Sequence, residues 1–150
     1  MNNFRDKKTN LALSILCDSI DGSEDNIEFP ITLVAGGQII TGLIISEESF
    51  YNLESNVALK PIYDIISKEK SQYFKADGSF INENITDEEI NEIPDTLWQR
   101  FIYLKDARYM TGNTFVPSEN NKGSAIQIRA SDVVAFNFGT FSTTKSDEDA

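Results

Sequence analysis

The amino-acid sequence predicts an α+β protein, in which an N-terminal helix precedes a small, strongly bent antiparallel sheet. The first observation is Ile31–Ser46, where two apolar β-branched runs flank Gly36-Gly37 in the pattern of a β-hairpin. The second is Gly42 inside the second run, where a bulge or a sharp bend is expected. The third is another pair of short apolar runs within Ile126–Gly139. Short strands with a bending glycine are typical of a strongly curved sheet.

A helix is expected over residues 10–20, before the first strand. The polar residues Asn10, Ser14 and Asp18 recur every four positions among apolar ones, which is helical spacing. Thr9 or Asn10 would cap the start of this helix. A strand is the alternative interpretation, because apolar residues also alternate along the same stretch.

The first strand is expected to begin near Ile27, and the hairpin that it opens ends at Ser46. Ser46 is a helix-capping residue, and the acids Glu47 and Glu48 follow it, where they favour the first turn of a helix. The sequence therefore predicts a short helix directly after the hairpin, with the ring of Phe50 available for burial.

Residues 54–99 are interpreted as a helical insertion between the strands. Pro61 suits the first turn of one helix. Thr86 and Glu89 have the spacing of a capping box, which predicts a second helix. Because this segment is short, we interpret it as part of a single domain that spans residues 10–140.

Four short strands are expected after the insertion, at residues 101–104, 107–110, 126–129 and 133–138. A polar loop over residues 111–123 separates the second of them from the third. The two ends of the chain, residues 1–9 and the acidic residues 141–150, are expected to be disordered tails.

The acidic composition counts against binding to nucleic acid. The 150 residues include 24 acids and 13 bases, for a net charge of −11, and the basic residues form no cluster. A protein that binds nucleic acid through its phosphates needs a basic surface. The same argument counts against anionic membrane surfaces, and no apolar run is long enough to span a membrane. Cys17 is the single cysteine and has no intrachain partner, so we expect a cytoplasmic protein.

The absence of histidine from the sequence counts against catalysis. Histidine is the commonest general base near neutral pH and the commonest metal ligand, so Ser–His and Cys–His nucleophile pairs are excluded. The acids of residues 87–92 lack EF-hand spacing, which makes a solvated helix face a better interpretation than a cation site. We therefore expect no enzyme activity, no cofactor and no bound metal.

The predicted sheet resembles the Sm-like fold, in which an N-terminal helix precedes a small bent five-stranded barrel. The residues that match its first motif are Thr32-Leu33, Gly37, Gly42, Glu47 and Asn52-Leu53. Its second motif corresponds to Ile126–Arg129, with Ala130 in place of a glycine. The resemblance implies an Sm-like barrel, with Arg129 beside a loop that contacts RNA.

Arg129 and Asn52 also have purely structural interpretations. Arg129 would be a strand arginine that pairs with an acid such as Asp106. Asn52 would cap a helix or donate a hydrogen bond to the sheet. Because the chain is acidic, we favour these interpretations over RNA contacts.

A closer resemblance is to the GvpU family of gas vesicle accessory proteins. It covers most of the chain, through the segments Phe29–Leu33, Gly37–Gly42, Ser46–Phe50, Phe101–Ala107 and Phe136–Gly139. The resemblance implies a non-catalytic accessory protein that binds the vesicle shell protein and affects how vesicles assemble or cluster. It also implies that the protein self-associates into an oligomer.

The candidate partner-binding residues are four acids and two phenylalanines, namely Asp87, Glu88, Glu89, Glu92, Phe136 and Phe138. The acids belong to residues 82–95, which contain six acids and no base and would face a basic partner. The two phenylalanines share one face of the last strand, where they would mediate self-association, because an edge strand must be paired or protected. Burial in the core is the alternative for these rings.

Two other classes of function stay open. One is a bacterial immunity-type protein, small, acidic and cytoplasmic, that masks a basic toxin. The other is an Sm-like module that binds a different partner, including RNA, although the net charge counts against RNA. A hydrolase is a more distant alternative.

Overall fold

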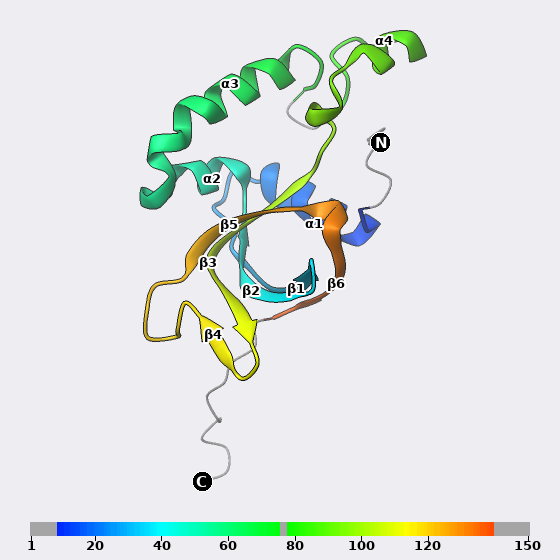
Figure 1. Cartoon of the computed structure of the whole chain (residues 1–150). Helices are drawn as coiled ribbons and strands as arrows, with labels where there is room; N and C mark the ends of the chain where they lie inside the picture. The colour runs from blue at the N-terminus through cyan, green and yellow to red at the C-terminus, as the bar shows by residue number, and fades with distance from the viewer. Residues whose placement is uncertain (1–8, 76–77, 140–150) are drawn as a thin grey trace.

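A six-stranded antiparallel sheet lies at the centre of the molecule, with helices beside it (Figure 1). The computed structural model describes residues 9–75 and 78–139. The strands are β1 (Phe29–Ala35), β2 (Gln38–Ile45), β3 (Phe101–Thr111), β4 (Thr114–Val116), β5 (Ser124–Arg129) and β6 (Val133–Phe138). The helices are α1 (Leu11–Asp21), α2 (Glu47–Asn52), α3 (Lys60–Ser71) and α4 (Asp87–Glu92), and the 3-10 turns are η1 (Glu54–Leu59), η2 (Asp95–Leu97) and η3 (Ala130–Asp132). The predicted combination of an N-terminal helix with an antiparallel sheet is confirmed, and the predicted tails lie, apart from Thr9, outside the described residues.

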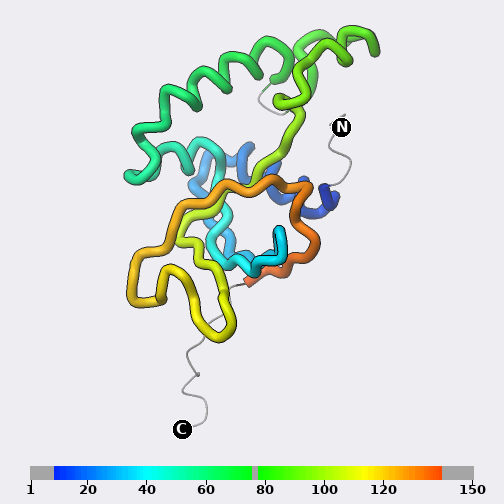
Figure 2. Tube along the Cα trace, in the orientation of Figure 1, coloured from blue at the N-terminus to red at the C-terminus, as the bar shows by residue number. Residues whose placement is uncertain are grey.

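The strand order makes the sheet curl without closing. The order is β4-β3-β2-β1-β6, and β5 pairs with the first half of β3 on the same edge as β4. The consecutive strands β5 and β6 therefore lie at opposite ends of the sheet, joined by the short turn η3 (Figure 2). No pairing joins β5 to β6 within the described part of the chain, so the sheet is open and the predicted Sm-like barrel is not confirmed.

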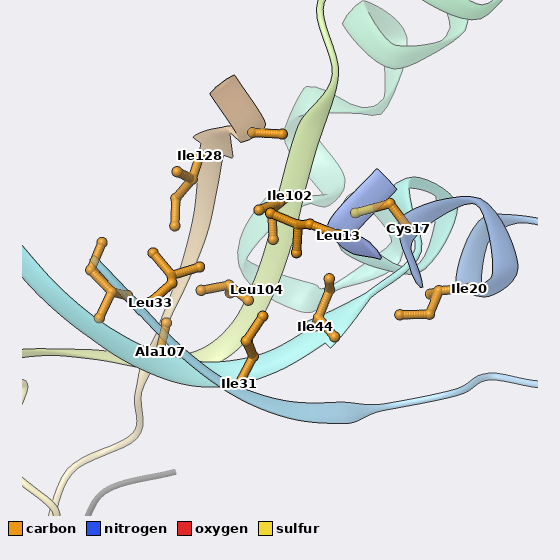
Figure 3. Close-up of a cluster of buried hydrophobic side chains, with 12 residues drawn as sticks. Leu13, Cys17, Ile20, Ile31, Leu33, Ile44, Ile102, Leu104, Ala107 and Ile128 are labelled. Carbon is orange, nitrogen blue, oxygen red and sulfur yellow. The ribbon is translucent and has the colours of Figure 1, made fainter. Parts of the chain in front are cut away.

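Helix α1 forms where the spacing predicts it, and the strand alternative is wrong. The side chain of Asn10 caps the helix, because its Oδ1 accepts a hydrogen bond from the Ala12 N–H at 2.9 Å. Leu13, Cys17 and Ile20 follow one face and are buried, so that α1 packs against the sheet (Figure 3).

The main core lies between α1 and the sheet. Apolar burial contributes about 25 cal/mol per Å² and is the main driving force for packing these elements together. Half-buried side chains from β5 and β6, among them Ile126 and Phe136, extend the core toward the ends of the sheet. The core is formed by Leu13, Cys17, Ile20, Ile31, Leu33, Ile40, Ile44, Ile102, Leu104, Ala107, Ile128 and Ala130.

The glycines of the first hairpin act as predicted. Gly36 and Gly37 have φ values of 57° and 78°, a conformation that glycine adopts without strain and that suits a two-residue hairpin turn. The pairing of β2 with β3 shifts register at Gly42, and a Cβ atom there would lie 3.1 Å from the Cα of Ala107. The predicted irregularity at Gly42 is therefore confirmed, and its cause is the close approach of β3.

The chain after the insertion differs from prediction in two respects. The strands expected at residues 101–104 and 107–110 form one strand, β3, which continues through a bulge where Asp106 has φ 49°. The loop expected at residues 111–123 contains the short strand β4, so β3 and β4 form a second hairpin. The sequence did not predict β4, because polar residues surround its three positions.

The insertion forms α3 and α4 as predicted. The Oγ1 of Thr86 accepts a hydrogen bond from the Glu89 N–H at 3.2 Å, and the same hydroxyl contacts the Glu89 carboxylate at 3.1 Å. The ring of Trp98, a residue that follows α4 and η2, packs edge-on against Phe74 and Phe80, with centroid distances of 5.3 and 5.8 Å. The insertion thus has an aromatic cluster that the sequence did not predict.

Candidate interaction surface

Strand β6 presents an uncharged edge at one end of the sheet. Within the described residues it pairs only with β1, and its sequence VVAFNF contains no charged residue. The side chain of Val134 is 79% exposed, the highest value among the large apolar residues described. A hollow of about 460 Å³ runs along the strand, lined by Asn10, Val133, Val134, Ala135 and Phe136.

The two predicted aromatic residues of β6 have different environments. Phe136 is half-buried and packs against the main core, whereas Phe138 is 53% exposed. Their rings meet edge to face at 5.7 Å, and the ring of Phe138 also contacts Phe29 at 5.4 Å. Phe138 is thus the ring that is available to a partner, while Phe136 mainly joins β6 to the core.

The four predicted acids lie together on α4 and are all exposed. Asp87, Glu88 and Glu89 occupy the first turn of the helix, where negative charge also stabilises the helix dipole. Figure 1 places α4 at the far end of the insertion, away from β6. The six predicted residues therefore belong to two separate surfaces.

In residues 9–75 and 78–139, no three acidic or cysteine side chains gather in a way that would hold a metal ion.

Two exposed apolar pairs were not predicted. Leu11 and Ile15 are one helical turn apart on α1, and their side chains are 74% and 57% exposed. Ile62 and Ile65 are exposed on α3, a helix without any buried residue. On α1 a signal was present in the sequence, because Leu11 and Ile15 form a stripe distinct from the one that contains Leu13.

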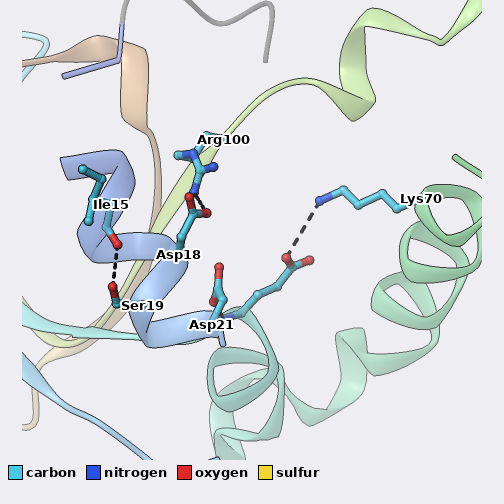
Figure 4. Close-up of polar contacts among 7 residues, drawn as sticks. Ile15, Asp18, Ser19, Asp21, Lys70 and Arg100 are labelled. Atoms are coloured by element: carbon cyan, nitrogen blue, oxygen red, sulfur yellow. Dashed lines mark hydrogen bonds and ion pairs between the residues drawn. The ribbon is translucent and has the colours of Figure 1, made fainter. Parts of the chain in front are cut away.

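A polar cluster connects α1, α2 and α3 (Figure 4). The Arg100 guanidinium lies 2.6 Å from the Asp18 carboxylate, and the Lys70 ammonium lies 3.8 Å from the Glu47 carboxylate. Asp21 Oδ1 accepts a hydrogen bond from the Glu47 N–H at 3.2 Å. Burial raises the pKa of the Asp21 carboxyl and that of the Glu47 carboxyl. These contacts join the insertion to the helices that pack on the sheet.

Arg129 is the last residue of β5 and is exposed, so it is a strand arginine as its structural interpretation expects. The carboxylate of Asp106 accepts a hydrogen bond from Arg108 at 2.8 Å, and among the described residues no ion pair joins Asp106 to Arg129. The side chain of Asn52 accepts a hydrogen bond from the Lys60 ammonium at 3.0 Å. Asn52 also lines a hollow of about 220 Å³ beside α2. Arg129 does not line this hollow, so the two residues do not share one site there.

Of the helices that the structure describes, none has the length and apolar character needed to cross a membrane.

Comparison with known proteins identifies a family. No curated protein and no solved structure matches the chain. A family described as gas vesicle protein GvpU-like matches residues 12–141, which include α1 apart from Leu11, the insertion and all six described strands. The chain therefore belongs to the GvpU-like family of gas vesicle proteins.

Proposed function

We propose that this chain is a non-catalytic accessory protein of gas vesicles, which binds the vesicle shell protein and associates with copies of itself. Membership of the GvpU-like family supports the connection with gas vesicles. The observation that carries the proposal is the separation of two different exposed surfaces, the acids of α4 and the uncharged edge of β6. The acids of α4 contact a basic surface of the shell protein, and β6 with Phe138 mediates self-association.

Two separate surfaces suit a protein that connects other particles. A copy bound to one vesicle through α4 keeps its β6 edge accessible to another copy. Two copies on different vesicles then link the vesicles, which affects their assembly or clustering. The site of action under this proposal is the cytoplasm, where vesicle and accessory protein meet.

The Sm-like character of the sheet belongs to the same proposal. It is supported by the strand order, in which the last strand pairs with the first and the short turn η3 separates β5 from β6. The open sheet leaves strand edges available for contacts between copies.

Flotation with intact gas vesicles tests the binding to shell protein. Wild-type protein should rise with the vesicles at low salt and stay in the lower phase at high salt, because exposed charge contacts are screened. In the variant D87N/E88Q/E89Q/E92Q, affinity at low salt should fall roughly tenfold, if each exposed charge contact contributes about 0.3–0.5 kcal/mol.

A matched control removes four exposed acids outside α4. The variant E24Q/D25N/E54Q/D64N has the same net charge as the α4 variant, and all four of its substituted side chains are exposed. It should float like wild-type protein. Equal loss of binding in both variants, or recovery that does not change with salt, would contradict a contact through α4. Failure of the wild-type protein to float at any salt concentration would contradict shell binding itself.

A further inference from the structure

We propose that two copies of the chain pair through the outer edges of β6, as antiparallel strands related by a two-fold axis with Phe136 opposite Phe136 of the second copy. This inference rests on the self-association in the proposed function and names the surface that performs it. The occupant of the β6 edge is therefore the same strand of a second copy, and the result is a continuous sheet across the dimer.

The backbone of β6 has hydrogen-bonding groups directed away from β1. The Gly139 N–H donates to the Pro30 carbonyl at 2.9 Å, which sets the alternation of hydrogen bonds along this antiparallel pair. Asn137 consequently directs its backbone groups toward β1, and Phe136 and Phe138 direct theirs outward. No described strand pairs with these outward groups, and a second strand would satisfy them.

The charge distribution favours β6 over other surfaces for contact between two copies. Each chain carries a net charge of −11, so two copies repel each other wherever their acids approach. Edge strands that stay single are usually protected by charged residues, and β6 has none. At the other end of the sheet, β5 carries the exposed charge of Arg129, and β4 is uncharged but has only three residues. Strand β6 is thus the longer neutral edge, and two acidic copies meet there.

The exposed side chains select the register. A two-fold axis perpendicular to the sheet at Phe136 places Val134 opposite Phe138 of the second copy. The symmetry creates this pair at two equivalent positions, and at each of them the most exposed apolar side chains of β6 cover each other. An axis at Ala135 would instead place Phe138 opposite Asp132 of the second copy. A bulge in the pairing of β1 with β6 leaves Val134 without a partner on β1, and the hollow of about 460 Å³ beside it has room for the second ring.

Disulfide trapping tests this register directly. In the proposed dimer, residue 135 of one copy lies opposite residue 137 of the other, with Cα atoms about 4.5 Å apart, which a disulfide can bridge. Ala135 and Asn137 are both exposed, and Cys17 is buried with its thiol pKa raised to about 12, so Cys17 does not interfere.

The two single variants are purified separately and mixed under mild oxidation, without vesicles. An equimolar mixture of A135C and N137C should form a covalent dimer that neither protein forms alone. A covalent dimer of A135C alone would overturn the register, because residue 135 would then face itself. Absence of a covalent dimer in the mixture would overturn pairing through β6.

Sedimentation equilibrium provides a second measurement. Val134→Lys places a charge at the centre of the proposed contact and should weaken dimerisation at least about tenfold, because the charge would face Phe138 of the second copy. Val116→Lys makes the same change at another exposed valine, on the edge strand β4, and should dimerise like wild-type protein. Equal dimerisation of wild-type protein and V134K, or equal weakening by both substitutions, would overturn the inference.

The dependence on salt concentration distinguishes pairing through β6 from shell binding through α4. Pairing of two acidic copies through a neutral edge should strengthen as salt rises, because repulsion between the copies is screened. Binding to the shell through α4 should weaken under the same change. Wild-type protein that floats with vesicles but never dimerises would overturn only the pairing of β6, and a dimer that never floats would overturn only shell binding.

Discussion

Glu47 is the residue at which α1, α2 and α3 meet. Its backbone N–H is bound to Asp21, and its carboxylate lies 3.8 Å from the Lys70 ammonium. Burial raises the pKa of the Glu47 carboxyl above its ordinary value of 4.5, an effect that Lys70 opposes and that the charge of Asp21 increases. The folded chain therefore holds this proton more tightly than the unfolded chain does.

The raised pKa of Glu47 predicts a pH dependence of stability. The stability that a raised pKa contributes is fully present below the unfolded value of 4.5 and is lost as the pH rises through the folded pKa. The free energy of unfolding of wild-type protein, minus that of Glu47→Gln, should therefore fall as the pH rises from about 4 to about 7. Urea unfolding at each pH measures this difference.

The control for this measurement is Glu54→Gln, which removes an exposed acid at the start of η1. The free energy of unfolding of wild-type protein, minus that of Glu54→Gln, should change less with pH than the corresponding difference for Glu47→Gln. If the free energy of unfolding of wild-type protein, minus that of Glu47→Gln, rises with pH, the assignment of a raised pKa to Glu47 is contradicted.

Residues whose conformation depends on close neighbours in the sequence were predictable. Asn10 and Ser46 cap helices through hydrogen bonds that reach only two or three residues, and Gly36-Gly37 forms a turn between adjacent strands. Asp106 was not predictable. Its positive φ is accompanied by a hydrogen bond from the Gly123 N–H, and that contact forms only after two distant segments fold together.

Helix α3 is an element held at the surface by few contacts. It has no buried residue. The ring of Tyr63 stacks on that of Tyr51, with a centroid distance of 4.8 Å and an interplanar angle of 17°, and Lys70 pairs with Glu47 at 3.8 Å. An element with so little burial opens more readily than the core.

Hydrogen exchange should therefore distinguish α3 from α1. Amides of α3 should exchange faster than those of α1, which packs on the main core. Tyr63→Ala should accelerate exchange in α3 by roughly twofold to tenfold, since an aromatic pair contributes about 0.5–1.5 kcal/mol, and should leave α1 unchanged. Ile65→Ala on the same helix serves as the control, because the Ile65 side chain is exposed. Equal acceleration in α1 and α3 would show that the two helices open together.

Elements with a strong local pattern were predicted, and those defined by long-range pairing were not. Helix α1, the first hairpin and the capped helix α4 follow from spacing and capping residues. Strand β4 has only three residues and exists because β3 extends far enough to pair with it. The candidate site shows the same limit, because the sequence named the acids of α4 and the rings of β6 but gave no indication that they lie far apart.

The charge of the whole molecule affects its folding as well as its contacts. A net charge of −11 on 150 residues produces repulsion that favours the unfolded chain. The melting temperature of V134K should therefore rise as NaCl is increased from about 0.02 M to about 0.5 M, because the repulsion is screened. This variant is used so that dimerisation does not contribute to the change. A melting temperature that falls over this range would indicate that attractive ion pairs outweigh the repulsion.

The curvature of the sheet was predictable, but its open form was not. Gly42 and the short strands indicated a strongly bent sheet. Closure of a barrel depends on whether the last two strands approach closely enough to pair, which is decided by packing across the whole molecule. The kind of sheet and the family were therefore predictable from the sequence, whereas the arrangement at the two ends of the sheet was not.

The position of β1 between β2 and β6 has a consequence for biosynthesis. Translation supplies β2 two residues after β1 ends, but β6 begins about 100 residues later, which at about 5–20 residues per second is a delay of roughly 5–20 s. During this interval the segment FPITLVA, which has no charged residue, has one unpaired edge on the nascent chain. A chain that is released before Val133 is translated therefore leaves β1, which lies between two strands in the folded sheet, with one edge that no strand covers.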